Sequence, residues 1–155
     1  MSRYIDQILQ PGERVLYSTT LHWIIFWPAI LAWIVAAGAW VMERRAGTDG
    51  GNLFWLIVAG AAVLAALYWM VQGWFRRWTT ETDVTTLRVV HKTGFIKRRT
   101  FEMNLDKVES VDVDQSIPGR LLGYGDVTVR GVGEGFETIK GIGSPLQFRN
   151  NITAR

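Results

Sequence analysis

The chain has 155 residues, so it offers room for one small folded domain beside any membrane segment. It contains no cysteine, which excludes disulfide bonds and thiolate metal sites. Its 17 basic and 14 acidic residues leave a net charge of +3, and because acids interleave with bases in the second half, no continuous stripe for nucleic-acid phosphates is predicted. A nucleic-acid partner is therefore not expected.

Residues 1–22 are predicted to form a short helix and a strand. In the stretch Tyr4 to Leu9 the apolar residues fall on one side of a helix, which Pro11-Gly12 would end. The stretch Glu13 to Thr20 then alternates in the manner of a strand. We expect this segment to pack on the domain formed by the end of the chain.

The next segment predicts a membrane hairpin. Trp23 to Met42 and Leu53 to Phe75 are runs of 20 and 23 residues without a formal charge, separated by a loop over residues 43–52. At about 1.5 Å of rise per residue, each helix would cross a hydrocarbon core about 30 Å thick. All eight tryptophans lie between Trp23 and Trp78, most of them near the ends of the runs, as in an interfacial belt. The alternative, a buried helix pair in a soluble bundle, would need a polar layer that the short β-rich remainder does not offer.

Small residues four apart predict where the two helices meet. This spacing occurs at Ala32 and Ala36 in the first run, and at Ala61 and Ala65, and Ala62 and Ala66, in the second. Alanine is also common in spans for other reasons, so both explanations stay open. Neither run has an ionisable side chain in its middle, which disfavours a transport pathway.

The distribution of basic residues predicts the orientation of the hairpin. Six basic residues flank it, whereas the loop holds only Arg44 and Arg45. By the positive-inside bias, both termini are expected in the cytoplasm.

Residues 76–155 are predicted to form a β-rich domain. From Thr79 onward apolar and polar residues alternate, and glycine-containing turns separate several of the strands. This pattern predicts an antiparallel meander that closes toward a small barrel or sandwich. Ser144, as an N-cap, and Pro145 have the sequence of a helix N-terminus, so a short C-terminal helix is expected over Leu146 to Ile152.

Several motifs together resemble a known family. They are Leu9-x-Pro11-Gly12-Glu13-x-Val15, His22-Trp23, Thr86-x-Arg88 with a turn at Gly94, and the run from Gly119 to Val127. With the two spans, they resemble the bacterial membrane proteins that carry a PH-like (pleckstrin-homology-like) domain, also called YdbS-like. The resemblance covers nearly the whole chain. It implies a small antiparallel β-barrel or sandwich with a C-terminal helix, whose sheet the strand Glu13 to Thr20 would complete.

The most specific part of the resemblance is the motif that contains Arg120, Gly123 and Gly125. We expect its glycines to be structural, because they bracket Tyr124 before a strand, where a chain reversal often needs positive φ. PH-like domains are binding and docking platforms, so the resemblance implies no particular activity.

One cluster of basic residues is a candidate binding site for anionic lipid headgroups. Lys92, Lys97, Arg98 and Arg99 flank the Gly94 turn. In eukaryotic PH domains a similar arrangement on the first hairpin binds phosphorylated lipid headgroups, and Lys92, Lys97 and Arg99 match its spacing loosely. Near an anionic leaflet each such side chain contributes about 1 kcal/mol. The alternative is a solvated basic hairpin that only follows the positive-inside bias.

Neither catalysis, a metal nor a cofactor is predicted. The chain has two histidines, His22 and His91, and no paired carboxylate motif, so metal hydrolysis and cysteine chemistry lack their components. The glycines at 131, 133 and 135 follow one strand and precede another, which predicts a hairpin turn instead of a phosphate-binding loop.

Together with the resemblance, the sequence predicts a non-enzymatic integral protein of the bacterial inner membrane, with two spans, whose cytoplasmic PH-like domain binds a protein partner or the anionic leaflet. The alternative is a structural subunit of a larger membrane assembly, possible also as a homo-oligomer, that uses the hairpin as its interface. A membrane enzyme is a third and less favoured class.

Overall fold

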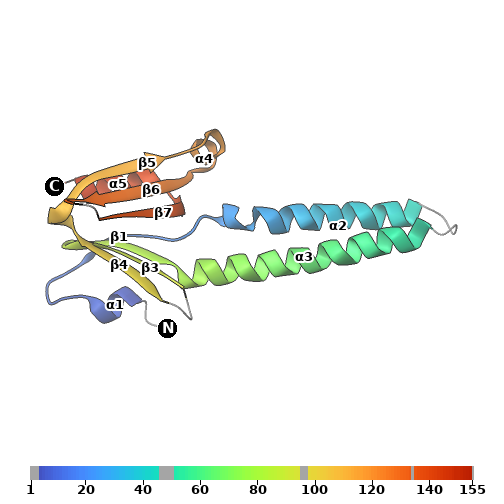
Figure 1. The fold of residues 1–155 in the computed structure, drawn as a ribbon, viewed down its shortest axis with the longest axis horizontal. Helices are drawn as coiled ribbons and strands as arrows, with labels where there is room; N and C mark the ends of the chain where they lie inside the picture. The colour runs from blue at the N-terminus through green and yellow to red at the C-terminus, as the bar shows by residue number, and fades with distance from the viewer. Residues whose placement is uncertain (1–3, 46–50, 95–97, 134, 155) are drawn as a thin grey trace. The chain divides into compact units, whose positions relative to one another are not determined.

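The structure is a computed structural model that describes residues 4–45, 51–94, 98–133 and 135–154 (Figure 1). The chain forms two compact units. One combines residues 1–22 with residues 76–155 and holds the described strands, and the other is formed by residues 23–75.

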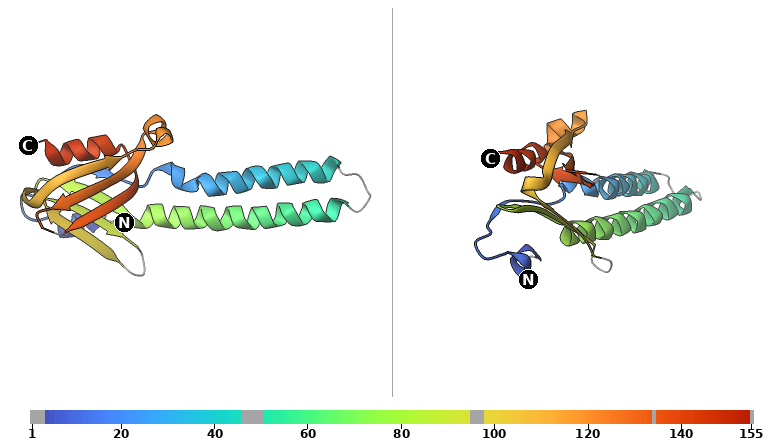
Figure 2. Two further views of the ribbon diagram at one scale, coloured as in Figure 1. Left: turned by 45° about the horizontal axis from the view of Figure 1, so that its top comes forward. Right: turned by 60° about the vertical axis from the view of Figure 1, so that its left-hand side comes forward.

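The unit of residues 23–75 is a helical hairpin. A short 3-10 helix, η1 (Trp23–Phe26), leads into helix α2 (Trp27–Arg45), and helix α3 (Gly51–Thr79) runs back beside it (Figure 2). By length and composition, Trp23–Arg45 and Leu53–Thr79 could each cross a membrane. The helices continue past the predicted apolar runs because the arginines at their ends are good helix formers in water.

Alanines mark the face that α2 turns to α3. Ala29, Ala32, Ala36 and Ala39 are buried, and on α3 Ala66 is fully buried. Ala62 and Ala65 are half-buried. The predicted role of Ala61 is wrong, because this residue is exposed on the outer side of α3.

The first sheet of the other unit has four antiparallel strands in the order β1-β2-β3-β4. The strands are β1 (Val15–Thr19), β2 (Glu81–Thr85), β3 (Arg88–Thr93) and β4 (Arg99–Asn104). Although the helical hairpin separates β1 from β2 in the chain, the two strands pair, with Tyr17 opposite Val84. The N-terminal strand therefore completes this sheet, as predicted.

The second sheet has three antiparallel strands in the order β5-β6-β7. The strands are β5 (Val108–Asp114), β6 (Tyr124–Gly131) and β7 (Phe136–Gly143), and the 3-10 helix η2 (Leu105–Lys107) connects β4 to β5. The predicted antiparallel strands are thus present, but the described strands form two sheets that do not close into a barrel.

The core of this unit is formed by both sheets and by the C-terminal helix α5 (Pro145–Thr153). Val84 and Val89 of the first sheet, Val127 and Ile139 of the second, and Phe148 of α5 are all fully buried. The predicted helix is present with Pro145 in its first turn. Ser144 does occupy the N-cap position, but its φ of 52° is left-handed and its side chain makes no capping hydrogen bond.

Two short elements were not predicted: strand β2, which has no apolar alternation, and helix α4 (Ile117–Leu122), which follows β5. Helix α1 (Tyr4–Ile8) was predicted and is shorter than expected. In β2 the buried residues are mostly polar, Thr82, Asp83 and Thr85 among them, so a period of two is absent from its sequence. Helix α4 has only six residues, including a proline and a glycine, which is too short for a helical period to be seen.

Candidate functional site

The basic cluster lies at one end of the first sheet. Lys92 is near the end of β3, opposite Glu81 on one side and Thr100 on the other, and Arg99 begins β4. Glu81 is also the first residue of β2, which follows α3 after one residue. Lys92 and Arg99 therefore lie at the end of the first sheet where the chain enters β2 from α3. Lys97 lies outside the described residues.

Two of the described cluster members already have contacts within their own unit. The ammonium of Lys92 is 4.6 Å from the centre of the Tyr4 ring, a cation–π contact with α1. Arg99 forms an ion pair with Glu137 of β7, with 3.1 Å between Nη2 and Oε2. Arg98 is exposed. Because the Arg99 side chain is 75% exposed, its ion pair is weak and can exchange for another anion.

A largely buried charged network centres on Arg88 and Glu13. Arg88 Nε and Nη2 each lie 3.1 Å from a carboxylate oxygen of Glu13, and Nη1 lies 2.8 Å from Glu102 Oε2. Nη2 also donates to the Ile8 carbonyl at 2.6 Å. Thr85 Oγ1 donates to Glu13 Oε1 at 2.6 Å. The network ties the segment after α1 to the turn between β2 and β3.

The network explains two of the motifs singled out in the sequence. The charged residues of these motifs are Glu13, in Pro11-Gly12-Glu13, and Arg88, in Thr86-x-Arg88. They are 75 residues apart in the sequence, and the structure brings them into contact. The Glu13 side chain is fully buried and that of Arg88 is 14% exposed. Sequence reasoning missed this pair, because opposite charges so far apart carry no signal of their contact in one sequence.

The run from Gly119 to Gly125 forms a compact turn around α4. Ser116 Oγ accepts a hydrogen bond from Gly119 N at 3.2 Å, which caps the helix. Gly123 ends the helix with a φ of 76° and donates to the Gly119 carbonyl. Gly125 lies in β6 and its φ is not positive, so the predicted reason applies only to Gly123. At Gly125 a Cβ would lie 2.7 Å from the Asp114 carbonyl oxygen.

Arg120 of the same motif is exposed on α4. A polar cleft of about 380 Å³ lies beside this turn, lined by Asp114, Gln115, Ser116, Tyr124, Gly125 and Asp126. The Asp126 carboxylate in it accepts a hydrogen bond from Gly141 N at 2.7 Å, and Gln115 donates to the Tyr124 carbonyl at 2.9 Å. These polar groups therefore stabilise the contacts between the ends of β5, β6 and β7.

His22 packs against this turn. Its ring stacks on Tyr124, with 5.2 Å between ring centres and 25° between planes, and its backbone N–H donates to the Gly141 carbonyl at 2.8 Å. Burial lowers the pKa of His22 and the charge of Arg77 lowers it further, while a hydrogen bond with the Leu122 backbone opposes the shift. Its surroundings at the end of α4 therefore disfavour the protonated imidazole.

The other histidine is part of the fold. His91 is buried in β3, and its Nδ1 lies 2.8 Å from Thr82 Oγ1 of β2. Burial, and then the charge of Arg99, lower its pKa to about 4, so the ring is neutral at physiological pH. In the part of the chain that the structure describes, no group of three or more His, Asp or Glu side chains could hold a metal ion.

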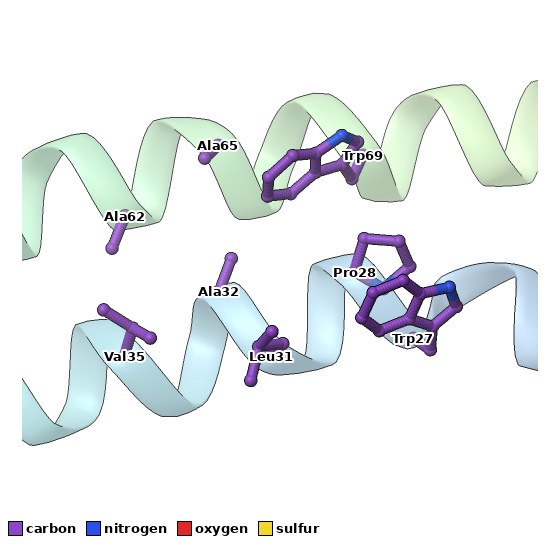
Figure 3. A pocket seen from close by; sticks show the side chains of 8 residues that line it. All are labelled: Trp27, Pro28, Leu31, Ala32, Val35, Ala62, Ala65 and Trp69. Atoms are coloured by element: carbon purple, nitrogen blue, oxygen red, sulfur yellow. The ribbon is translucent and has the colours of Figure 1, made fainter.

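The helical hairpin has an apolar groove of its own. It has a volume of about 490 Å³ and runs between α2 and α3, where small side chains leave space between larger ones (Figure 3). It is lined by Trp27, Pro28, Leu31, Ala32, Val35, Ala62, Ala65 and Trp69. With such a lining, the groove suits an apolar chain or helix and offers no chemistry.

Residues 15–150 match a family model described as bacterial PH domain. The match includes β1, the helical hairpin, both sheets and the first six residues of α5. Comparisons with curated proteins and with solved structures gave no match.

Proposed function

We propose that this chain, which belongs to the bacterial PH domain family, is a non-enzymatic binding module anchored in the inner membrane by its helical hairpin. In this proposal residues 23–42 and 53–75 span the membrane and residues 43–52 connect them. Residues 76–155, completed by residues 1–22, form the cytoplasmic binding domain. PH-like domains are in general binding modules, which supports this assignment over an enzyme.

The exposure of the apolar helices is the observation that carries the proposal. Only 6% of the most apolar stretch of Leu53–Thr79 is buried, and 22% of that of Trp23–Arg45. The outward side chains include Ile34, Ile57 and Leu64, each more than 60% exposed. A surface of this size in water would be an interaction or aggregation site, whereas in a bilayer it faces hydrocarbon.

We expect both termini to be cytoplasmic. The six basic residues that flank the hairpin outnumber the two in its loop, and with two spans both ends lie on one side. A reporter fused after Arg155 should therefore show a cytoplasmic location, and one inserted within residues 47–51 a periplasmic location. A periplasmic C-terminus would contradict the orientation.

The anionic leaflet is the binding surface that we favour for the basic cluster. Lys92 and Arg99 lie at the end of the first sheet that receives the chain from α3, so the anchor would hold them near the headgroups. A tethered second contact needs little intrinsic affinity, because its effective concentration is high. About 1 kcal/mol for each basic side chain is then enough to orient the domain.

This proposal predicts a salt-dependent contact in the full-length protein. With a fluorophore on Thr100→Cys in lipid nanodiscs, anionic lipid should protect the label from an aqueous quencher and neutral lipid should not. Added salt should remove the protection, because charges are screened beyond about 8 Å at physiological ionic strength. Reversing the charges of Lys97, Arg98 and Arg99 to Glu should abolish most of it.

A matched control reverses the charges of two other exposed basic residues of the same unit. Lys107 and Arg130 are both exposed, and Lys107 bonds through its carbonyl to Val132 N beyond the end of β6. Lys107→Glu with Arg130→Glu should leave the protection intact. The contrary outcome is a Thr100→Cys label that is equally accessible to the quencher in anionic and neutral nanodiscs at low salt. The basic cluster would then be a solvated face, and the domain would bind a protein partner instead of the leaflet.

The apolar groove supports a second candidate function, a structural subunit of a membrane assembly. A helix of another subunit, or of a second copy, would fit between Val35 and Trp69, where small residues leave space. Isolation in mild detergent followed by mass spectrometry separates the two functions. A stoichiometric protein that is lost on Ala62→Leu favours the assembly, and anionic lipid lost on charge reversal favours the leaflet module.

A further inference from the structure

Helix α4 carries two large apolar side chains that are almost fully exposed. Ile117 is 87% exposed and Leu121 is 88% exposed, which are the highest values among the large apolar residues described. They are four residues apart, so they project from one face of the helix. Arg120, exposed beside Leu121, is the one charged residue of α4.

Hydrogen bonds and close packing fix the position of α4 in its unit. The Ser116 cap and the left-handed Gly123 fix the two ends of α4. Gly119 is buried against the Tyr124 carbonyl, only 2.7 Å from where a Cβ would lie. The Gly123 carbonyl also accepts a hydrogen bond from Ser144 N at 2.9 Å, so the turn is joined to the start of α5. Ile117 and Leu121 therefore point outward from an anchored helix.

The segment that precedes the hairpin in the chain, Leu21 and His22, packs at the end of α4. His22 stacks on Tyr124 and bonds to the backbone of Leu122, the last residue of α4. An isolated bridge between Leu21 and Ile142 holds the same segment against β7. The residue after His22 is Trp23, the first of the apolar run. Since consecutive Cα atoms are about 3.8 Å apart, the chain passes directly from His22 into the apolar run.

We propose that Ile117 and Leu121 insert into the interfacial layer of the leaflet that the hairpin crosses, giving the domain an apolar contact beside its anchor. The inference rests on the proposed membrane anchoring. Amphipathic surfaces with a basic residue bind there because apolar side chains enter the acyl boundary while the cation reaches the phosphates, and Arg120 supplies this cation. The bilayer is favoured over a protein because continuity with the anchor places it within reach.

A matched control lies at the far end of β6. Val132 is 76% exposed and apolar, but it follows Gly131, whereas α4 precedes Tyr124 at the other end of the strand. Eight residues at about 3.3 Å each separate the two ends by more than 20 Å. Since the chain has no cysteine, single cysteines can be introduced and labelled without other changes.

The experiment places an environment-sensitive fluorophore on Ile117→Cys, Leu121→Cys, Val132→Cys and Val35→Cys in the full-length protein. Each variant is reconstituted in nanodiscs of phosphatidylcholine and phosphatidylglycerol, with a nitroxide quencher on the lipid or with iodide in the water. We expect labels at 117 and 121 to show a blue shift, loss of fluorescence with the lipid quencher and protection from iodide. The label at 132 should show the reverse, and the label at 35 should be quenched only from the lipid.

Each contrary outcome has its own meaning. If the label at 35 is quenched by lipid while those at 117 and 121 respond to iodide as the label at 132 does, the inference is wrong and the anchoring stands. If the labels at 117 and 121 are protected from iodide without quenching from lipid, a protein or a second copy covers α4, which also overturns the inference. A label at 35 that responds to iodide would overturn the anchoring itself.

Discussion

Replacing Arg88 by alanine should lower the free energy of unfolding of the domain by about 3–5 kcal/mol, because it leaves a buried carboxylate without its cation. The Glu13 side chain is fully buried and lies 3.1 Å from two nitrogens of Arg88. The change also removes the donor to the Ile8 carbonyl, which helps to hold α1. Pulse proteolysis in urea, with the protein in mild detergent, would measure the shift in the unfolding midpoint.

The chain offers a close control for this substitution. Arg130 forms an ion pair with Asp112 at 3.0 Å, but the two side chains are 60% and 53% exposed. Arg130→Ala should therefore change the stability by less than about 1 kcal/mol. If Arg88→Ala is no more damaging than Arg130→Ala, burial does not decide the strength of the Glu13 pair, and the network is not what joins the N-terminal segment to the sheet.

The direction of the acid dependence gives an independent check on the same network. Burial alone would raise the pKa of Glu13, but hydrogen bonds from Thr85, Gln10 and Arg88 outweigh it and hold the pKa below its usual value of 4.5. A carboxylate with a lowered pKa stabilises the folded state above its unfolded pKa, and this contribution is lost as the pH falls through the folded value. The stability advantage of the wild type over Glu13→Gln should therefore disappear below pH 4.5. If the free energies of unfolding of the wild type and Glu13→Gln still differ by the same amount below pH 4.5, the lowered pKa of Glu13 is contradicted.

The sequence was sufficient for features that depend on composition or on a local period. Uninterrupted apolar runs predicted both long helices, and alternation predicted most of the strands. Alternation over Glu13 to Thr20 predicted a strand, and the family resemblance implied that this strand completes the sheet, as the pairing of β1 with β2 confirms. By contrast, β2 was missed because it is buried with polar side chains, whose burial depends on partners such as His91 for Thr82.

The contacts of the candidate sites could not be predicted, because they join distant parts of the chain. The approach of Lys92 to Tyr4 and of Arg99 to Glu137 follows from strand register and from the packing of α1, neither of which is present in a local pattern. The exposure of Ile117 and Leu121 could not be predicted either. In the sequence they look like ordinary core residues, and only the fold of α4 shows that they face outward.

The second large effect is expected at Gly125, where even a methyl group has no room. A Cβ there would lie 2.7 Å from the Asp114 carbonyl oxygen and from Gln115 Cγ, and 3.2 Å from Pro145 Cγ. The carbonyl belongs to the end of β5 and the proline to the first turn of α5, so relief requires movement of two elements. Gly125→Ala should cost about 3 kcal/mol, the upper range for overpacking, and valine should prevent folding.

Gly123 provides the comparison that separates crowding from backbone strain. Its Cβ would meet open space, but its φ of 76° is left-handed, so Gly123→Ala should cost about 1–2 kcal/mol. Pulse proteolysis should therefore rank the variants as wild type, Gly123→Ala and Gly125→Ala in order of falling midpoint. If both alanine variants unfold at the wild-type midpoint and yet lose the salt-dependent leaflet contact, these glycines take part in binding and the structural role predicted for them is wrong.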